Sequence, residues 1–184
     1  MRGTFQVKSE YLDSLTGIAA RRYFDKQLNR AWMNAQKTEN PLSLLFCDID
    51  QFIEFHEHYG GPAADNCLRR VGLCLHSTLR RPTDLAARYE GERFAILLPY
   101  TDAHGALVIA DRMLAKVRSL AIPHECSDTA RVVTISIGGH SLWPVPGLST
   151  NTLIHLADIR LFQAKHCGRN QSRISTACRE EPDE

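Results

Sequence analysis

Apolar residues recur along the chain with two different spacings, and the longer spacing predicts helices. Phe24, Leu28 and Trp32 repeat every four residues, which places them on one side of a helix. Three later segments are also predicted to be helical. The four predicted helices cover residues 21–36, a segment after the Gly60-Gly61-Pro62 break, residues 103–119 and residues 152–165.

Short apolar runs between these helices predict strands. Residues 42–47 are almost continuously apolar, as is typical of a strand buried on both faces. Residues 85–89 and 94–98 flank a short segment that contains a glycine, the pattern of a β-hairpin. Residues 132–137 are rich in β-branched side chains and predict a fourth strand. The order α-β-α-β-β-α-β-α, with room for a final short strand, indicates a sheet flanked by helices, of the α/β or α+β class.

Length and composition fit one soluble domain. The chain has 184 residues, of which 43% are hydrophobic and 23% charged, close to the globular average. Because 22 Lys+Arg balance 21 Asp+Glu, no basic field favours nucleic-acid binding. No apolar run reaches the roughly 18 residues of a membrane span, which argues against membrane insertion. The six cysteines form no C-x-x-C pair, which argues against zinc or a disulfide framework and indicates a reducing compartment.

Carboxylates near the predicted central strand could carry chemistry. Asp48 and Asp50 stand where that strand ends, and Glu92 stands in the predicted hairpin turn. If the strand lies beside the hairpin, Asp48 and Glu92 face each other across the sheet end. Two such carboxylates suit Mg²⁺ with substrate phosphates, as metal-assisted phosphoryl or nucleotidyl transfer requires. The alternative is that these aspartates only end a strand in solvent.

Five motifs follow one another between about residues 10 and 173. They are Asp13-Ser14-Leu15-Thr16-Gly17 with Arg21-Arg22, Phe46-Cys47-Asp48-Ile49-Asp50-Gln51-Phe52, Arg88-Tyr89-Glu90-Gly91-Glu92-Arg93-Phe94, Ser136-Ile137-Gly138, and Ala157-Asp158 with Ala164-Lys165-His166-Cys167-Gly168-Arg169-Asn170. With these motifs the chain resembles the GGDEF domain of bacterial diguanylate cyclases. The resemblance implies an α+β fold, an α/β sandwich whose central, mostly antiparallel sheet is like the palm of nucleotidyl cyclases.

The resemblance also implies an activity and a domain plan. Members of this family join two GTP into cyclic di-GMP plus two pyrophosphates across a two-fold homodimer. Residues 13–175 would form the GGDEF domain, residues 1–12 a helix or linker from an upstream sensor or receiver domain, and residues 176–184 a flexible tail. A cytoplasmic location is expected, alone or as part of a larger signalling protein.

The resemblance places metal and catalytic residues on three positions of this sequence. Asp48 and Glu92 match the catalytic carboxylates that bind metal, and Ile49 matches the residue that offers its backbone carbonyl. The implied ion is Mg²⁺, or Mn²⁺, when nucleotide is bound. No organic cofactor is implied.

The GTP-binding residues are implied in the same way. Lys165 and Arg169 match the pair that grips the triphosphate, and because they are four residues apart they could share a helix face or its end. Asp65 and His56 match the guanine-contacting positions, and Gly91 matches the second glycine of the signature turn.

Four positions depart from the family pattern. Glu90 replaces the first signature glycine, where a positive φ would cost about 1–2 kcal/mol. Arg93 replaces the second signature acid, and its side chain is expected to turn away from a bound metal. Ile53 replaces a phosphate-side lysine, and His56 replaces an asparagine that reads guanine. These departures predict an impaired cyclase, unless Glu90 supplies the missing carboxylate.

A second set of residues matches the family's product-binding inhibitory site. Arg81-Pro82-Thr83-Asp84 has the register of its Arg-x-x-Asp motif, and Arg112 matches a further arginine that clamps the dinucleotide. Arginine suits phosphate or a guanine edge, and aspartate accepts from guanine N–H groups. The alternative is a surface ion pair between Arg81 and Asp84, with Arg112 on a solvated helix face.

Three functions therefore stay open. The first is an impaired cyclase that binds cyclic di-GMP through Arg81, Asp84 and Arg112. The second is an active diguanylate cyclase with product inhibition. The third is a non-catalytic module for dimerisation or GTP binding.

Overall fold

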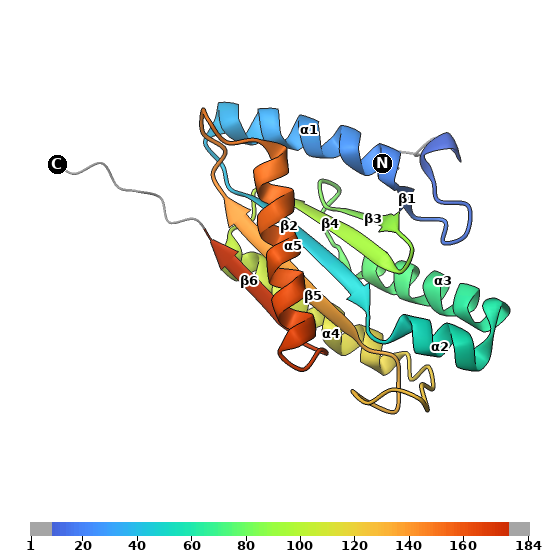
Figure 1. The fold of residues 1–184 in the computed structure, drawn as a ribbon. Helices are drawn as coiled ribbons and strands as arrows, with labels where there is room; N and C mark the ends of the chain where they lie inside the picture. Colours follow the sequence, from blue (N-terminus) through green and yellow to red (C-terminus); the bar gives the residue numbers. More distant parts are fainter. Residues whose placement is uncertain (1–8, 177–184) are drawn as a thin grey trace.

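The centre of the molecule is a six-stranded sheet with the strand order β1-β3-β4-β2-β5-β6 (Figure 1). The structure, a computed structural model, describes residues 9–176. Strands β3, β4, β2 and β5 pair antiparallel, whereas the edge strands β1 and β6 pair in parallel with their neighbours. The strands are β1 (Ala19–Ala20), β2 (Leu42–Ile49), β3 (Leu85–Glu90), β4 (Arg93–Pro99), β5 (Ile135–Leu142) and β6 (Ser172–Thr176).

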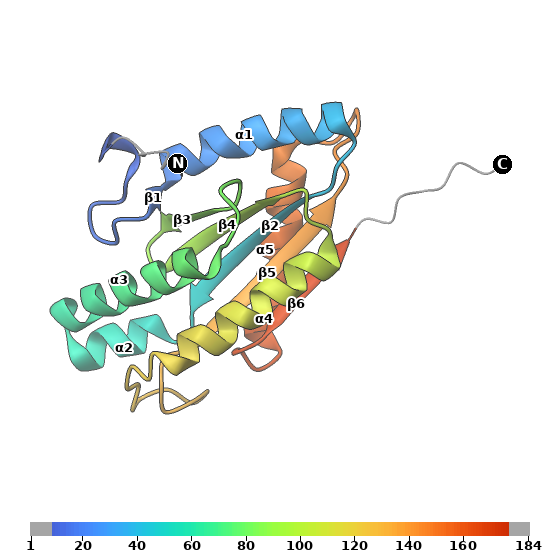
Figure 2. The same cartoon turned by 180° about the vertical axis from the view of Figure 1, so that it is seen from behind.

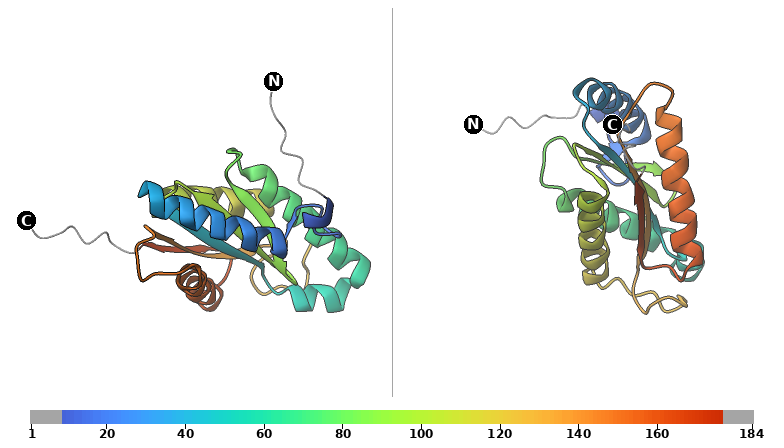
Figure 3. Two further views of the ribbon diagram at one scale, coloured as in Figure 1. Left: turned by 90° about the horizontal axis from the view of Figure 1, so that it is seen from above. Right: turned by 90° about the vertical axis from the view of Figure 1, so that its left-hand side faces the viewer.

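Helices cover both faces of this sheet. Helices α1 and α5 lie on one face, and α2, α3 and α4 lie on the other (Figures 1 and 2). The right-hand view of Figure 3 shows α4 and α5 on opposite sides of the sheet. The expected α+β sandwich with a mostly antiparallel sheet is confirmed. The helices are α1 (Arg21–Thr38), α2 (Phe52–Tyr59), α3 (Gly61–Thr78), α4 (Ala103–Ser119) and α5 (Thr150–His166).

Strand β2 divides the interior into two apolar cores. Leu45 and Cys47 belong to the core under α3 and α4, whereas Leu44 and Phe46 belong to the core under α1 and α5. Successive side chains of a strand point to opposite faces, so every residue of β2 is buried. This burial fixes the position of Asp48 near the end of the strand. None of the described helices has the length and apolar character needed to cross a membrane.

Most elements begin and end within two residues of their predicted bounds, but three differ. Strand β1 and helix α2 were not predicted as separate elements, and β5 runs over 135–142 where 132–137 was expected. The prediction ended this strand at Ile137, where the run rich in β-branched residues stops before Gly138. In the structure α5 packs directly on this glycine: a Cβ at Gly138 would lie 1.8 Å from the backbone nitrogen of Leu161. Most of the predicted linker 1–12 and tail 176–184 lies outside the described residues, although Ser9–Tyr11 form a short 3-10 helix.

His140 is a buried titratable side chain on β5. It is 5% exposed, and its Nδ1 lies 2.7 Å from Ser175 Oγ. Its Nε2 has no hydrogen-bond partner in the described part of the chain. Burial, and then the Arg160 guanidinium, lower the pKa of His140 below its ordinary value. The side chain is therefore neutral in the folded protein near neutral pH.

We expect the domain to lose stability on acidification because of His140. In the unfolded chain histidine titrates near pH 6.5, so below that pH the unfolded state takes up a proton that the folded state does not. The melting temperature should fall from about pH 6.5 downward, and His140→Asn should reduce this fall. The exposed His76 is the matched control, since His76→Asn should leave the pH dependence unchanged. Parallel melting curves for wild type and His140→Asn from pH 8 to about pH 5 would contradict the prediction.

Candidate functional site

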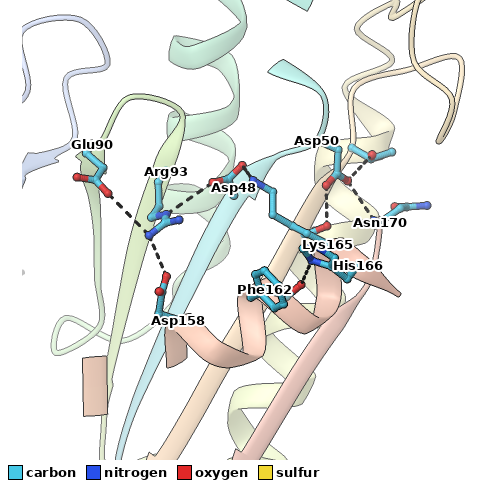
Figure 4. Close-up of polar contacts among 11 residues, drawn as sticks. Asp48, Asp50, Glu90, Arg93, Asp158, Phe162, Lys165, His166 and Asn170 are labelled. Carbon is cyan, nitrogen blue, oxygen red and sulfur yellow. Dashed lines mark hydrogen bonds and ion pairs between the residues drawn. The ribbon is translucent and has the colours of Figure 1, made fainter. Parts of the chain in front are cut away.

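Asp48 lies near the end of β2, where β4 and α5 meet it. The antiparallel register sets Asp48 opposite Arg93, and the last turn of α5 brings Lys165 to it. Lys165 Nζ lies 2.6 Å from Asp48 Oδ1, and Arg93 Nε lies 3.6 Å from Oδ2 (Figure 4). The Asp48 side chain is only 5% exposed. Each carboxylate oxygen therefore faces a cation away from bulk water.

Arg93 is surrounded by carboxylates. One of its terminal nitrogens, Nη1, lies 2.9 Å from Asp158 Oδ1 and 3.7 Å from Glu90 Oε1 (Figure 4). Its guanidinium carbon also lies 5.7 Å from the ring centroid of Phe46. The expectation that Arg93 turns away from a bound metal stays a prediction. Three carboxylates and an aromatic face hold Arg93 beside Asp48.

Gly91 and Glu92 form the two-residue turn between β3 and β4. Glu90 pairs with Arg93 across this turn, and only Gly91 of the turn has a positive φ, of 49°. The strain expected at Glu90 is therefore absent. The register also corrects the expectation that Asp48 faces Glu92, because Asp48 pairs with Arg93. Among the described residues, the Glu92 side chain has no hydrogen bond or ion pair.

The residues that could hold a metal are placed as follows. Asp48 and Ile49 are adjacent at the end of β2, and Glu92 lies in the turn before β4. In residues 9–176 no three His, Cys, Asp or Glu side chains are grouped so that they could hold a metal ion. Both Asp48 oxygens already contact protein cations.

Asp50 joins three segments of the chain beneath this site. Its carboxylate is fully buried and accepts hydrogen bonds from Thr134 Oγ1 at 2.7 Å, Ser136 Oγ at 2.6 Å and the Asn170 backbone N–H at 3.1 Å. Buried carboxylates are tolerated when such donors satisfy them. Asp50 thereby fastens the segment after α5 to the ends of β2 and β5. Its role is to position this segment, whereas the alternative reading of these aspartates placed them in solvent.

The other residues predicted to contact nucleotide, and Ile53, are exposed. Ile53 and His56 are exposed on α2, and Asp65 is exposed on α3. Arg169 is also exposed and lies beyond the end of α5 with a φ of 59°. It therefore does not share a helix face with Lys165, which corrects one of the two arrangements expected from their spacing.

Arg81 and Asp84 form an ion pair in the loop before β3. Arg81 Nη2 lies 3.0 Å from Asp84 Oδ1, and Arg81 Nε donates to Oδ2 at 3.2 Å. The Arg81 side chain is 44% exposed, whereas that of Asp84 is 2% exposed. Arg81 also donates a hydrogen bond to Thr101 Oγ1. The Nη2 contact is not aligned as a hydrogen bond, so Asp84 Oδ1 lacks a hydrogen-bond donor among the described residues.

A hollow of about 310 Å³ adjoins Arg81 on the α4 side of the sheet. Gly105 and Ile109 of α4 line it, and Arg112 follows Ile109 by three residues. Residues three and four apart share a helix face, so Arg112 lies on the α4 face that lines the hollow. The other residues around the hollow are Pro41, Tyr100, Thr101 and Asp102.

Sequence reasoning missed the contacts that Asp158, Glu90 and Asp50 make in and beneath the site around Asp48. Asp158 and Lys165 are seven residues apart on α5, and this spacing, which places them on one face, was an available signal. Glu90 pairs with Arg21 at 3.4 Å across 69 positions of the chain, for which no local pattern exists. From the sequence Asp50 was interpreted only as an aspartate at a strand end, because its three hydrogen-bond donors come from remote segments of the chain.

Comparison with known proteins identifies relatives of this chain. A family model described as the diguanylate cyclase GGDEF domain matches residues 10–171. The diguanylate cyclase TpbB of Pseudomonas aeruginosa is 34% identical over 164 residues, which are 89% of this chain and 37% of that protein. The response regulator PleD of Caulobacter vibrioides is 36% identical over 158 residues, 86% of this chain and 34% of that protein.

A solved structure agrees in fold as well. The GGDEF domain of DgcB from Caulobacter crescentus, determined in complex with c-di-GMP, is 28% identical and superposes with a TM-score of 0.81. The match covers 95% of this chain and 98% of that one. The chain thus spans a complete solved domain but little more than a third of the length of TpbB or PleD. It belongs to the diguanylate cyclase GGDEF domain family.

Proposed function

We propose that this chain is a GGDEF domain of cyclic di-GMP signalling that binds cyclic di-GMP and condenses GTP poorly. The ion pair between Arg81 and Asp84, beside the hollow on α4, is the observation that carries the proposal. The related DgcB domain was determined with c-di-GMP bound, which supports the same ligand class. A homodimer and an upstream sensor or receiver domain stay predictions.

The second site has the groups that a guanine dinucleotide needs. Arg81 is exposed enough to offer its planar guanidinium to a phosphate or a guanine edge. When Arg81 turns to the ligand, the Asp84 carboxylate becomes an acceptor for guanine N–H groups, and its Oδ1 already lacks a donor. Arg112 adds a second guanidinium on the α4 side. Together these residues favour an anionic ligand with a donor-rich base.

The residues at the predicted GTP site support the proposal that catalysis is impaired. Arg93 contacts the Asp48 carboxylate, Ile53 offers no charge to a phosphate, and His56 presents a ring in place of an amide. A cyclase transition state depends on placed electrostatic groups, so each change lowers the rate.

Calorimetry with cyclic di-GMP tests the proposal. Arg81→Ala removes charge-assisted hydrogen bonds worth about 1.5–3 kcal/mol each, so affinity should fall at least about tenfold. Glu92→Ala, in the turn of the other site, should bind like wild type. Equal affinities for wild type and Arg81→Ala would contradict the proposal. A complete absence of binding by wild type would favour the module for dimerisation or GTP binding.

An active diguanylate cyclase is the second candidate. The retention of Asp48, Glu92, Lys165 and Arg169 and the similarity to TpbB favour it. Turnover of GTP separates it from the impaired domain, because both could bind cyclic di-GMP.

A further inference from the structure

Acidic side chains of three different elements surround the positively charged Arg93. Asp48 of β2, Glu90 of β3 and Asp158 of α5 contact its guanidinium at 3.6, 3.7 and 2.9 Å (Figure 4). We propose that this guanidinium permanently takes the position of a divalent ion, so that Asp48 does not bind Mg²⁺ or Mn²⁺. The inference concerns the GTP site alone and is independent of dinucleotide binding at Arg81.

The two cations that contact Asp48 already neutralise it. Arg93 and Lys165 lie 3.6 and 2.6 Å from its two carboxylate oxygens. A divalent ion at Asp48 would therefore meet two cations at close range. Repulsion between like charges at such distances is strong in a partly buried site.

Displacing Arg93 would also break the contacts that hold its side chain in place. The side chain is 27% exposed and projects from a strand residue that is paired directly with Asp48. Its guanidinium lies over the Phe46 ring, and Asp158 accepts a hydrogen bond from it at 2.9 Å. A metal ion would have to compete with all of these contacts at once.

The same contacts argue against Glu90 as a replacement for the missing carboxylate. Glu90 Oε2 lies 3.4 Å from Arg21, and its Oε1 lies 3.7 Å from Arg93. Both oxygens of Glu90 therefore face cations, as those of Asp48 do. Replacing Arg93 with an acidic residue would remove a positive charge from the vicinity of Asp48, Glu90 and Asp158. A metal ion would then be able to bind there.

Titration with Mn²⁺ alone, followed by the electron paramagnetic resonance signal of the free ion, tests the inference. Wild type and Arg93→Lys, which keeps the charge, should bind no Mn²⁺ at the site. Arg93→Glu should bind one Mn²⁺ ion per chain where wild type binds none, because affinity rises with ligand charge. Arg30→Glu, an exposed position on α1, is the control for the same change in net charge.

Two results would overturn the inference. One is a stoichiometric Mn²⁺ ion bound to wild type and lost in Asp48→Asn. The other is an Arg93→Glu variant that melts like wild type and still binds no Mn²⁺, because Arg93 would then not be what excludes the ion. Cyclic di-GMP plays no part in either measurement, so failure here leaves the Arg81 proposal untouched.

Discussion

As a confirmed homodimer supplied with GTP and Mg²⁺, this domain is expected to form cyclic di-GMP at least about 10²-fold more slowly than TpbB. Loss of one electrostatic contact to a transition state costs about 10²–10³ in rate. Here Arg93 lies on the Asp48 carboxylate, and Ile53 occupies the position where the family pattern has a phosphate-side lysine. These two changes act on different parts of the nucleotide, so their effects should combine.

The measurement resolves the products by chromatography, first with Mg²⁺ and then with Mn²⁺. The domain is used at high concentration or fused to a dimerising coiled coil, so that a missing dimer cannot explain a missing product. A rate like that of TpbB, abolished by Glu92→Ala, would show an active cyclase and contradict the prediction. In that case Glu90→Ala would show whether Glu90 acts as the replacement carboxylate.

Gly138→Ala is expected to destabilise the fold by about 3 kcal/mol, which corresponds to a melting temperature about 6–12 °C lower. The new Cβ would lie 1.8 Å from Leu161 N and 2.2 Å from Leu161 Cα. These are backbone atoms, so no side-chain rotation relieves the contact, and α5 must move away from β5. Because α5 carries Lys165 and Asp158, the same change should disturb the Asp48 site.

Thermal melting of matched glycine variants checks this. Gly61 begins α3, its φ is not positive, and a Cβ there would meet nothing within 4 Å. Gly61→Ala should therefore melt within about 2 °C of wild type, since surface substitutions change stability by about 0.5 kcal/mol or less. Equal melting temperatures for Gly138→Ala and Gly61→Ala would show that α5 does not pack on β5 as described.

Local pattern was enough for most of the secondary structure. The spacing of Phe24, Leu28 and Trp32 predicts α1 because a helix face repeats every three to four residues, and this requires no knowledge of the rest of the chain. The hairpin of β3 and β4 follows from two apolar runs around Gly91 for the same reason. The motifs also predicted the family and its mostly antiparallel sheet.

Strand register could not be read with the same certainty. A shift of one residue exchanges the two faces of a strand. The register observed pairs Asp48 with Arg93, where Glu92 was expected. Turn geometry and sheet pairing set the register, and neither can be read from the amino-acid composition.

The sequence by itself determined the helices, the hairpin, the family and the positions that depart from it. Only the tertiary structure decided what those departures do. Arg93 replaces a signature acid, and carboxylates 45 and 65 positions distant in the chain hold it beside Asp48. Asp50 is likewise a buried anchor because Thr134, Ser136 and Asn170 converge on it. The physical reason is that a charged side chain is placed by its electrostatic neighbours, and folding brings those neighbours from remote segments.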